Sequence, residues 1–477
     1  MFFKHFFEPG LAQNSYLVGC QKTGESIVID PRRDIDEYLS TAAENGLRIT
    51  HITETHIHAD FLSGTRELAE ATGGRVLLSD EGGADWLYQF DHEPLRDGDR
   101  IRVGNLTLDV LHTPGHTPEH VSFLLTNPPA GSDPVMVFTG DFVFVGDVGR
   151  PDLLEEAAGL KDTKVIGARQ MFHSLKKFRE LPEYVQVWPA HGAGSACGKS
   201  LGAVPSSTVG YELRTSWALQ VEDEDEFVAM LLDGQPEPPY YFAMMKRLNK
   251  AGADLLSNRV EFRELSPNAV ADAAEDGAQL VDTRSNYAFV GGHIPGSYSI
   301  PDHSGAPTWA GWLLSYDRPI VLIADRSTAE RYRMRLTRVG FDRVVGYLPS
   351  VDAWADTGRP VETTPQLQAE DVVEDGELAI LDVRGESEFQ EGHIRGAHNV
   401  HAGRLPNQAD GLPRSEPLVV HCQSGFRSVI ATSVLQSLGF EQVHNLVGGL
   451  DAWQRVHPSL ERESRDESDS KAVPSTA

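Results

Sequence analysis

The amino-acid sequence predicts an α/β protein of about three domains. Three observations carry this prediction: short apolar runs alternate with helical stretches, motifs rich in histidine and aspartate follow several of these runs, and the second half of the chain contains an internal repeat. The chain has 477 residues. That length exceeds what one hydrophobic core usually organises, so several domains are expected.

The composition of the chain limits the kinds of molecule that it is expected to bind. The formal net charge is -28, from 42 basic and 70 acidic residues. Binding to nucleic acid needs basic patches that neutralise phosphates, so no nucleic-acid partner is expected. No apolar run approaches the ~20 residues that span a bilayer, so no membrane partner is expected either. The three cysteines are few and far apart, which indicates free thiols and a cytoplasmic location. We also expect a homo-oligomer.

The first part of the chain alternates predicted strands and helices. Residues 206–256 then read as helices that the Gln235–Pro239 segment interrupts, and we assign them to the same first domain. This alternation is typical of α/β folds. Met1–Pro9 is too short and too charged for a signal peptide and is predicted to be an opening strand. The other predicted strands include Ser26–Asp30, Arg75–Leu78 and Pro134–Phe138, and the predicted helices include Asp34–Asn45 and Gly64–Thr72.

Four histidine- or aspartate-bearing motifs each end a strand-like run. They are Thr55–Asp60, His112–Thr117, Thr139–Asp141 and Pro189–Gly192. Loops that follow strands gather at one edge of a sheet, where imidazole and carboxylate groups are common ligands of first-row metals. A single such histidine is often only structural, but four motifs in this order predict a metal centre.

This series of motifs resembles the metallo-β-lactamase superfamily over residues 1–255. The resemblance implies an αββα sandwich. Members related to glyoxalase II have a histidine directly after Asp60 in the first motif, and they use it to bind a second metal. This sequence has Phe61 there, and a phenyl ring cannot bind a metal, so a single ion is expected.

The branch that the sequence most resembles is the persulfide dioxygenases. That resemblance implies one Fe(II) per chain, held by His56, His116 and Asp141. Two histidines and one carboxylate leave coordination positions open for substrate and dioxygen. His58, Asp60 and His191 are then expected to orient ligands and water, although His58 has a metal-binding counterpart in dinuclear relatives. Zinc is the alternative metal, and it would support hydrolysis by an activated water.

Two further segments are candidates for binding the thiol that carries the substrate. Arg150 and Asp152 lie in the region where relatives contact the thiol, and Arg150 is expected to pair with a carboxylate of glutathione or a similar carrier. A purely structural Arg–Asp turn is the competing interpretation. Cys197 follows His191 in a glycine-rich segment, Gly192–Lys199. It is either redox-active there or a small buried hydrophobic residue.

The second half of the chain contains a repeat. Asp282–Gly296 matches Asp382–Gly396 at an offset of 100 residues (382 − 282), and later Gly-Phe and Asp-Ala-Trp pairs also match. Each copy reads as strand, loop, helix and strand, which is typical of a parallel sheet. We therefore divide the chain into a metal domain (residues 1–255), a first repeat domain (256–364), a second repeat domain (365–458) and a disordered tail (459–477).

The second copy contains the candidate catalytic cysteine. Cys422 ends an apolar strand, a short loop with a glycine follows, and Arg427 lies five residues later. This loop resembles the rhodanese active site, which implies an α/β rhodanese domain with a cysteine persulfide on Cys422. Backbone N–H groups at a helix N-terminus favour the thiolate, and Arg427 adds charge. A phosphatase loop is excluded because Cys422 and Arg427 enclose only four residues.

The first copy is predicted to be catalytically inactive. Asp325 occupies the position of Cys422, and no glycine follows it. Fifteen positions separate Asp325 from the Gly-Phe pair (340 − 325), against seventeen from Cys422 (439 − 422), so its loop is shorter.

Three functions fit these observations. The first is a bifunctional enzyme that oxidises a small-molecule persulfide with dioxygen to sulfite and transfers sulfane sulfur through Cys422, giving or consuming thiosulfate. The second is a zinc-dependent thioester hydrolase of the glyoxalase II type joined to a rhodanese. The third is a sulfur carrier or sensor without oxidative chemistry. The residues do not distinguish glutathione from coenzyme A, bacillithiol and related thiols as the carrier.

Overall fold

The computed structural model describes residues 1–153, 163–195, 197–198, 201–235, 237–372, 378–414 and 416–461. The chain divides into two compact units. The first unit consists of Met1–Val260 together with His303–Trp312 and Glu330–Arg343, and the second contains the remaining segments from Glu261 onward. Two segments of the predicted domain 256–364 thus pack within the first unit, where the buried Arg33 donates to Asp342 at 2.6 Å.

The first unit contains two six-stranded sheets. Their strand orders are β1-β2-β3-β4-β5-β6 and β12-β11-β10-β9-β8-β7. The strands of the first sheet are β1 (Phe2–Glu8), β2 (Gln13–Cys20), β3 (Glu25–Ile29), β4 (Arg48–Thr53), β5 (Arg75–Ser79) and β6 (Glu93–Leu95). Those of the second are β7 (Arg100–Val103), β8 (Leu106–His112), β9 (Val121–Thr126), β10 (Pro134–Gly140), β11 (Gln186–Pro189) and β12 (Ser207–Thr208).

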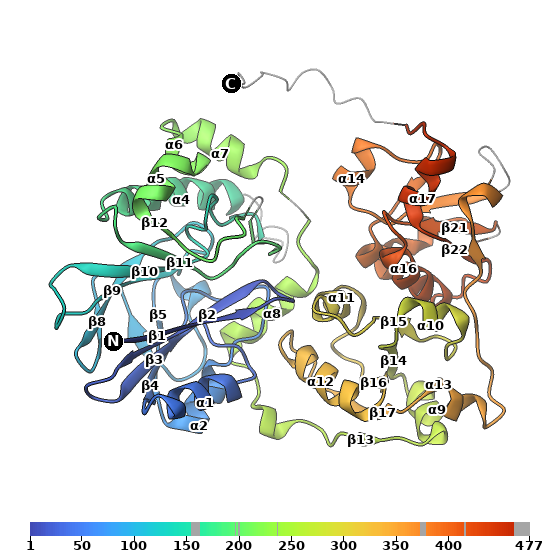
Figure 1. The fold of residues 1–477 in the computed structure, drawn as a ribbon, viewed down its shortest axis with the longest axis horizontal. Helices are drawn as coiled ribbons and strands as arrows, with labels where there is room; N and C mark the ends of the chain where they lie inside the picture. Colours follow the sequence, from blue (N-terminus) through green and yellow to red (C-terminus); the bar gives the residue numbers. More distant parts are fainter. Residues whose placement is uncertain are drawn as a thin grey trace. The chain divides into compact units, whose positions relative to one another are not determined.

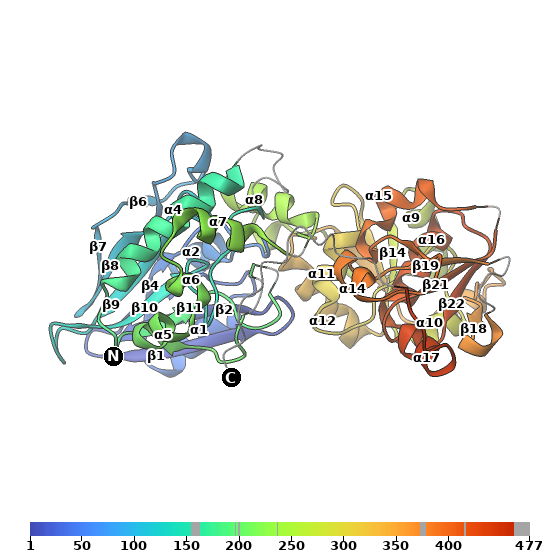
Figure 2. The same ribbon diagram turned by 90° about the horizontal axis from the view of Figure 1, so that it is seen from above.

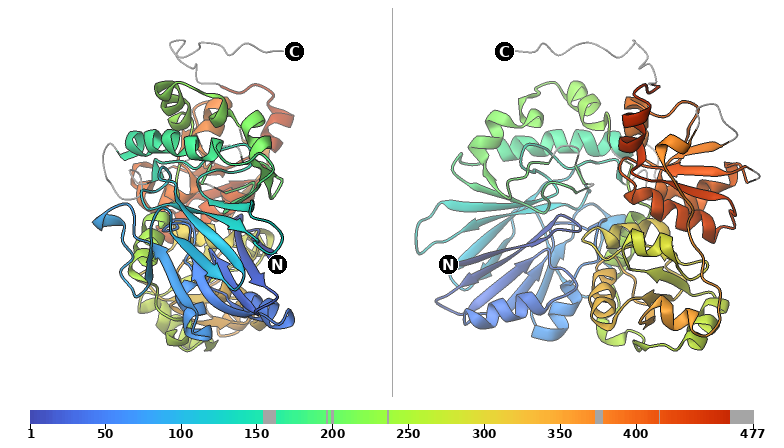
Figure 3. Two further views of the ribbon diagram at one scale, coloured as in Figure 1. Left: turned by 90° about the vertical axis from the view of Figure 1, so that its left-hand side faces the viewer. Right: turned by 45° about the vertical axis from the view of Figure 1, so that its right-hand side comes forward.

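Helices cover the outer faces of these two sheets. In Figure 1 and in the right-hand view of Figure 3, α1 and α2 lie on one side and α4 to α7 on the other, which gives the predicted αββα sandwich. The helices are α1 (Asp36–Glu44), α2 (Thr65–Thr72), α4 (Thr163–Arg179), α5 (Val209–Thr215), α6 (Trp217–Gln220), α7 (Glu224–Leu232) and α8 (Tyr241–Ala251), followed by α11 (Ala306–Leu313) and most of α12 (Arg326–Thr337).

The core of the sandwich lies between the sheets. Alternating side chains of β8 and β9 point into it: Leu108 pairs with Leu125, and Val110 with Phe123, and all four are fully buried. This alternation is the period of two that a strand with one buried face requires. The core thus anchors the strands whose following loops carry the four motifs.

The second unit contains two five-stranded sheets of the same design. Their orders are β13-β17-β16-β14-β15 and β18-β22-β21-β19-β20, and every pairing recorded in them is parallel. The equal orders confirm that the repeat is a duplicated fold. The strands are β13 (Arg263–Glu264), β14 (Gln279–Asp282), β15 (Tyr298–Ser299), β16 (Ile320–Ile323), β17 (Val344–Leu348), β18 (Gln366–Leu367), β19 (Ala379–Asp382), β20 (His398–Asn399), β21 (Leu418–His421) and β22 (Val443–Leu446).

Helices surround these two sheets, as Figure 2 shows for α16 beside β21 and β22. Several begin at caps that the sequence supplies: Ser266 accepts a hydrogen bond from Ala269 N at the start of α9, next to a proline at the first helical position. The helices are α9 (Pro267–Glu275), α10 (Asn286–Gly291), α13 (Val351–Ala355), α14 (Glu386–Glu391), α15 (Leu405–Gln408), α16 (Phe426–Ser437) and α17 (Gly449–Val456).

Ordered structure extends slightly beyond the predicted second repeat domain. The predicted disordered tail begins at residue 459, but His393 N donates to Glu461 O at 2.9 Å and Glu461 N to His393 O at 3.0 Å. Backbone pairing thus includes Glu461, which lies within the predicted tail, and residues 462–477 lie outside the described residues. Among the described helices, none is long and apolar enough to cross a membrane.

Candidate metal centre and cysteine loop

The four predicted motifs follow strands of both sheets in the first unit. His56 lies after β4, and His116, Asp141 and His191 lie after β8, β10 and β11. All four side chains are essentially fully buried. The two sheets therefore bring residues that are far apart in the sequence to one edge of the sandwich.

His56, His116 and Asp141 form a compact triad. Asp141 Oδ2 lies 3.8 Å from His56 Nε2 and 3.4 Å from His116 Nε2. The three potential ligand atoms all lie within 4.8 Å of one another. None of these three atoms has a hydrogen-bond partner among the described residues. Buried polar atoms without partners are costly, so their convergence fits a bound metal ion.

Hydrogen bonds on the far side of each ring fix which nitrogen faces the centre. His116 Nδ1 lies 2.8 Å from the Arg150 carbonyl oxygen, and His56 Nδ1 lies 3.0 Å from Thr55 Oγ1. Asp141 N donates to His120 Nε2 at 3.0 Å, which places the Asp141 backbone. Partners of this kind orient the rings of metal-binding histidines.

Burial also sets the protonation of the triad. It lowers the pKa of His56 and of His116 well below the usual range, and it raises the pKa of Asp141 to about 6. The histidines are therefore neutral near pH 7, which is the form that binds metals.

His58 lies beside the triad but outside it. Its Nε2 is 3.1 Å from Asp30 Oδ1, and its ring centroid is 4.4 Å from that of the buried Phe61. Burial opposes ionisation, but the Asp30 carboxylate raises the pKa of His58 to about 9. Asp30 also accepts from Thr55 N at 2.7 Å, so it holds two residues of the first motif.

The second group of potential ligands consists of Asp60, His191 and Cys197. Their ligand atoms also lie within 4.8 Å of one another, and all three residues are buried. Burial raises the pKa of the Cys197 thiol well above its usual value. The structure thus brings Asp60 and His191 into contact with Cys197 rather than leaving them as isolated orienting groups.

Arg150 and Asp152, the predicted thiol-contact residues, pair with each other. Arg150 Nε donates to Asp152 Oδ1 at 2.8 Å, and Nη2 donates to Oδ2 at 2.5 Å. Both residues are buried. This pair matches the structural Arg–Asp turn, and a contact of Arg150 with a thiol carrier stays a prediction.

Sequence reasoning missed two buried residues of α8, of which Asn249 holds the metal-binding loop. Asn249 Nδ2 donates to the carbonyl oxygens of His58 and Phe61, at 2.8 and 2.7 Å, and its Oδ1 accepts from Ser63 N at 2.9 Å. Lys246, one turn earlier, lies with Nζ 4.8 Å from the Trp86 ring centroid, and burial lowers its pKa to about 8. Neither residue belongs to a motif, so no local signal identified them.

The second site is the Cys422 loop between β21 and α16. Cys422 is buried, and its Sγ accepts from Gly425 N at 3.2 Å. Gly425 has φ of 98°, a left-handed conformation that favours glycine, and it directly precedes α16. The sulfur therefore lies at a helix N-terminus, where backbone N–H groups stabilise an anion.

Arg427 is fixed beside this loop by a carboxylate. Its Nη1 and Nη2 donate to the two oxygens of Glu388 at 2.7 Å each. The first copy has Ala288 at the position equivalent to Glu388. A comparison of the two copies in the sequence could therefore have identified Glu388 as the partner of Arg427. Bidentate pairing of this kind holds a guanidinium in one orientation.

The first copy has no such loop. α12 begins at Arg326, directly after Asp325, whereas α16 begins four residues after Cys422. Asp325 Oδ1 instead accepts from Ser327 N and Thr328 N, at 3.0 and 3.1 Å. Asp325 thus caps the N-terminus of α12, and the start of this helix directly after Asp325 agrees with the shorter loop predicted for this copy.

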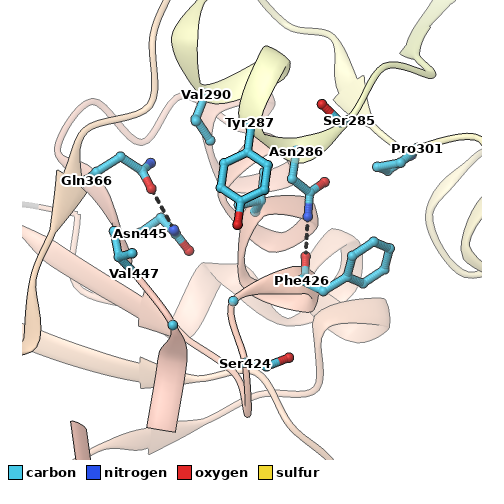
Figure 4. Close-up of a pocket in the computed structure, with 13 residues that line it drawn as sticks. Ser285, Asn286, Tyr287, Val290, Pro301, Gln366, Ser424, Phe426, Asn445 and Val447 are labelled. Carbon is cyan, nitrogen blue, oxygen red and sulfur yellow. Dashed lines mark hydrogen bonds between the residues drawn. The ribbon is translucent and has the colours of Figure 1, made fainter. Parts of the chain in front are cut away.

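A cavity of about 310 Å³ adjoins the Cys422 loop within the second unit. Figure 4 shows Asn286 and Tyr287 of α10 on one side and Ser424, Phe426 and Asn445 on the other. Asn286 Nδ2 donates to the Phe426 carbonyl oxygen at 3.1 Å. The first copy thereby contributes part of the surroundings of the Cys422 loop.

Comparison with known proteins identifies the same kinds of domain that the fold shows. The metallo-beta-lactamase superfamily model matches residues 9–191, and the rhodanese-like domain model matches residues 266–357 and 365–456. A solved metallo-beta-lactamase from Staphylococcus aureus subsp. aureus COL is 45% identical, with a TM-score of 0.68, and the match covers 73% of this chain and 99% of that one.

Two curated relatives match the first part of the chain. A hydroxyacylglutathione hydrolase from Rhodospirillum rubrum is 36% identical over 37% of this chain and 60% of its own length. The mitochondrial persulfide dioxygenase ETHE1 of Homo sapiens is 32% identical over 39% of this chain and 67% of its own length. The chain spans about half to three fifths of the length of the first two hydrolases that it matches.

The fold and the matched regions define a metallohydrolase-type domain joined to tandem rhodanese-like domains. The chain belongs to the metallo-beta-lactamase superfamily, with two rhodanese-like domains following that fold. The predicted fold class and family are thereby confirmed. The fold implies a metal ion, and the buried histidine and aspartate clusters are compatible with one.

Proposed function

We propose that the protein oxidises a low-molecular-weight thiol persulfide, such as glutathione persulfide, and transfers sulfane sulfur through Cys422. The observation that carries the proposal is the buried triad of His56, His116 and Asp141, whose converging nitrogen and oxygen atoms have no hydrogen-bond partner among the described residues. The same chain contains an intact Cys422 loop. The likeness to persulfide dioxygenases supports the same assignment.

Two histidines and one carboxylate are the ligand set of non-haem Fe(II) oxygenases. When bound, Fe(II) supplies the redox chemistry that couples dioxygen to the terminal sulfur. The overall reaction is RSSH + O₂ + H₂O → RSH + SO₃²⁻ + 2H⁺, so dioxygen is reduced and the terminal sulfur is oxidised to sulfite. The chain contributes neutral imidazoles, oriented by Arg150 O and Thr55, and it buries the ligand side chains away from bulk water.

The rhodanese step uses residues of the second unit. The Cys422 thiolate first attacks the terminal sulfur of a second RSSH molecule, the S–S bond of that donor breaks, and the carrier leaves as thiol. Sulfite then attacks the terminal sulfur of the Cys422 persulfide, its bond to Cys422 Sγ breaks, and thiosulfate leaves with the electron pair remaining on Cys422 as thiolate. The Gly425 N–H at 3.2 Å and the N-terminus of α16 stabilise that thiolate. The same step runs in reverse when thiosulfate is the donor. Sulfite made at the metal centre is thus an acceptor for Cys422.

The decisive experiment measures iron and oxygen uptake in the same samples. Protein purified without oxygen is expected to contain one Fe(II) per chain, and glutathione persulfide is expected to drive oxygen uptake that His56→Ala abolishes. The matched control is Cys422→Ser, which should lose sulfur transfer and keep oxygen uptake. Iron-loaded protein that consumes no oxygen with persulfide would refute the proposal.

A zinc-dependent thioester hydrolase joined to a rhodanese is the second candidate. The specific observations in its favour are the likeness to hydroxyacylglutathione hydrolases and the second ligand cluster around Asp60 and His191. Hydrolysis of a glutathione thioester by the zinc-loaded protein, with no oxygen uptake by the iron-loaded protein, would establish this function in place of the first.

A further inference from the structure

A small cavity lies in the first unit, where the segment that follows α8 meets the segment that follows α12. Its volume is about 160 Å³, and the residues that line it include Asp254, Arg259, Asp342 and Arg343. All of these residues belong to the first unit, and none belongs to the candidate metal ligands or to the Cys422 loop. The cavity is therefore separate from both sites described above.

The chain around this cavity is basic, although the protein as a whole is acidic. Residues 330–343 contain five arginines and two acidic residues, which gives a local charge of +3 (5 − 2), whereas the whole chain has a formal net charge of -28. A local excess of positive charge in an acidic protein attracts anions to that part of its surface. The charge pattern therefore indicates an anion as the ligand of the cavity.

Three guanidinium groups lie close together at the cavity. The Arg33 side chain is fully buried, and Arg333 Nη2 donates to the Val260 carbonyl oxygen at 2.9 Å, next to Arg259 in the sequence. Burial and the charge of Arg33 lower the pKa of Arg259, and burial and the charge of Arg259 lower the pKa of Arg333. These cations therefore repel one another, and a bound anion would offset that repulsion.

Arg259 provides hydrogen-bond donors that the chain does not use. Its Nε donates to the Leu256 carbonyl oxygen at 3.0 Å, whereas its two Nη groups have no hydrogen-bond or ion-pair partner among the described residues. The side chain is half-buried and lines the cavity. A guanidinium group binds two oxygens of one oxyanion through parallel N–H donors, so Arg259 fits such a ligand.

The carboxylates that act on Arg259 already interact with Arg33. Asp342 Oδ1 accepts from Arg33 Nη1 at 2.6 Å, and Glu67 Oε1 lies 4.0 Å from Arg33 Nε. Asp254 also lines the cavity, but its carboxylate is not among the groups whose charges act on Arg259. The positive charge of Arg259 is therefore left for a ligand.

We propose that this cavity binds a doubly charged tetrahedral oxyanion, such as thiosulfate, sulfate or phosphate, with Arg259 and Arg343 as its charged contacts. A cavity needs about 10–15 Å³ to hold one water molecule, so 160 Å³ is enough for an ion of five heavy atoms. The bound ion joins the segment after α8 to the segment after α12. The inference does not depend on the proposed function, because it uses no residue of the metal centre or of the Cys422 loop.

The test is isothermal titration calorimetry on full-length, iron-loaded protein carrying Cys422→Ser, which prevents turnover of thiosulfate. Thiosulfate, sulfate and phosphate are titrated separately at matched ionic strength, and one ion is expected to bind per chain. Arg259→Gln should weaken binding about 10-fold or more, because charge-assisted hydrogen bonds are lost, and Arg343→Gln should weaken it as well. Arg331→Gln removes the same charge from an exposed position of α12 outside the cavity and should bind like the parent protein.

The three ions also distinguish the source of the ligand. Tighter binding of thiosulfate and sulfate supports a sulfur oxyanion as the ligand, and tighter binding of phosphate supports a phosphate-bearing one. Binding of none of the three ions, an unchanged affinity in both Arg259→Gln and Arg343→Gln, or an equal loss in Arg331→Gln would overturn the inference. Oxygen uptake with persulfide is recorded on the same samples, and its absence would refute the proposed function without affecting this site.

Discussion

Asn249 connects α8 to the metal-binding loop, and its replacement by alanine tests whether this contact holds the loop in place. Asn249 donates two buried hydrogen bonds, to His58 O and Phe61 O, and accepts a partly buried one from Ser63 N, at 2.7–2.9 Å. Each is worth about 0.5–1.5 kcal/mol net, and the substitution also leaves buried backbone groups without partners. We therefore expect Asn249→Ala to lower the free energy of local opening of residues 58–63 by about 2–4 kcal/mol.

Hydrogen–deuterium exchange measures this opening directly, which matters because a chain of two units need not unfold in one step. A loss of about 2–4 kcal/mol accelerates exchange by roughly 30-fold to 1,000-fold, since each 1.4 kcal/mol is a factor of ten. Arg247→Ala, an exposed position of the same helix, is the matched control and should change exchange very little. If Asn249→Ala exchanges like that control at Ser63, α8 does not hold the loop.

Three further changes test the second unit. Asp325→Cys in a Cys422→Ser background should give no sulfur transfer in a thiosulfate assay, because α12 begins directly after Asp325 and leaves no loop for the sulfur; measurable turnover would contradict this. Glu388→Gln should slow Cys422-dependent transfer about 10-fold, because Arg427 loses charge-assisted bonds worth about 1.5–3 kcal/mol. Oxygen uptake should stay at the wild-type level. An unchanged transfer rate would show that Arg427 needs no partner. Burial, with Arg427 nearby, lowers the pKa of His401 to about 4. As the pH falls from 6.5, the ordinary pKa of histidine, toward 4, His401 therefore takes up a proton in the unfolded chain before it does so in the folded protein. The free energy of unfolding that is present above pH 6.5 is lost over this range. Thermal unfolding across this range should show a smaller loss for His401→Gln, and an equal loss would contradict the assignment.

Several features of the sites were predictable from local sequence. The order of the motifs predicted a metal centre, the resemblance to persulfide dioxygenases implied His56, His116 and Asp141 as its ligands, and the structure brings these three together. The spacing of Cys422 and Arg427 predicted the loop at the start of α16. These predictions depended on short patterns of neighbouring residues, together with the strands and loops predicted directly beside them in the sequence.

Other features were not predictable in this way. Glu388 and Asn249 lie outside every motif, and each meets its partner only because the fold brings distant segments together. The sequence argument from Phe61 predicted a single metal ion. That count of ions stays a prediction, and only the fold shows that the ligand atoms of Asp60, His191 and Cys197 lie within 4.8 Å of one another.

The sequence by itself predicted the alternation of strands and helices, the duplicated fold and the cysteine loop from periodicity and spacing, whereas the assignment of the triad came from the resemblance to persulfide dioxygenases. Only the tertiary structure decided which atoms face one another. The two oxygens of Asp141 face different clusters, and Asp325 caps a helix where Cys422 begins a loop. Those outcomes depend on where packed strands end in space and on where each helix begins, and no single motif contains that information.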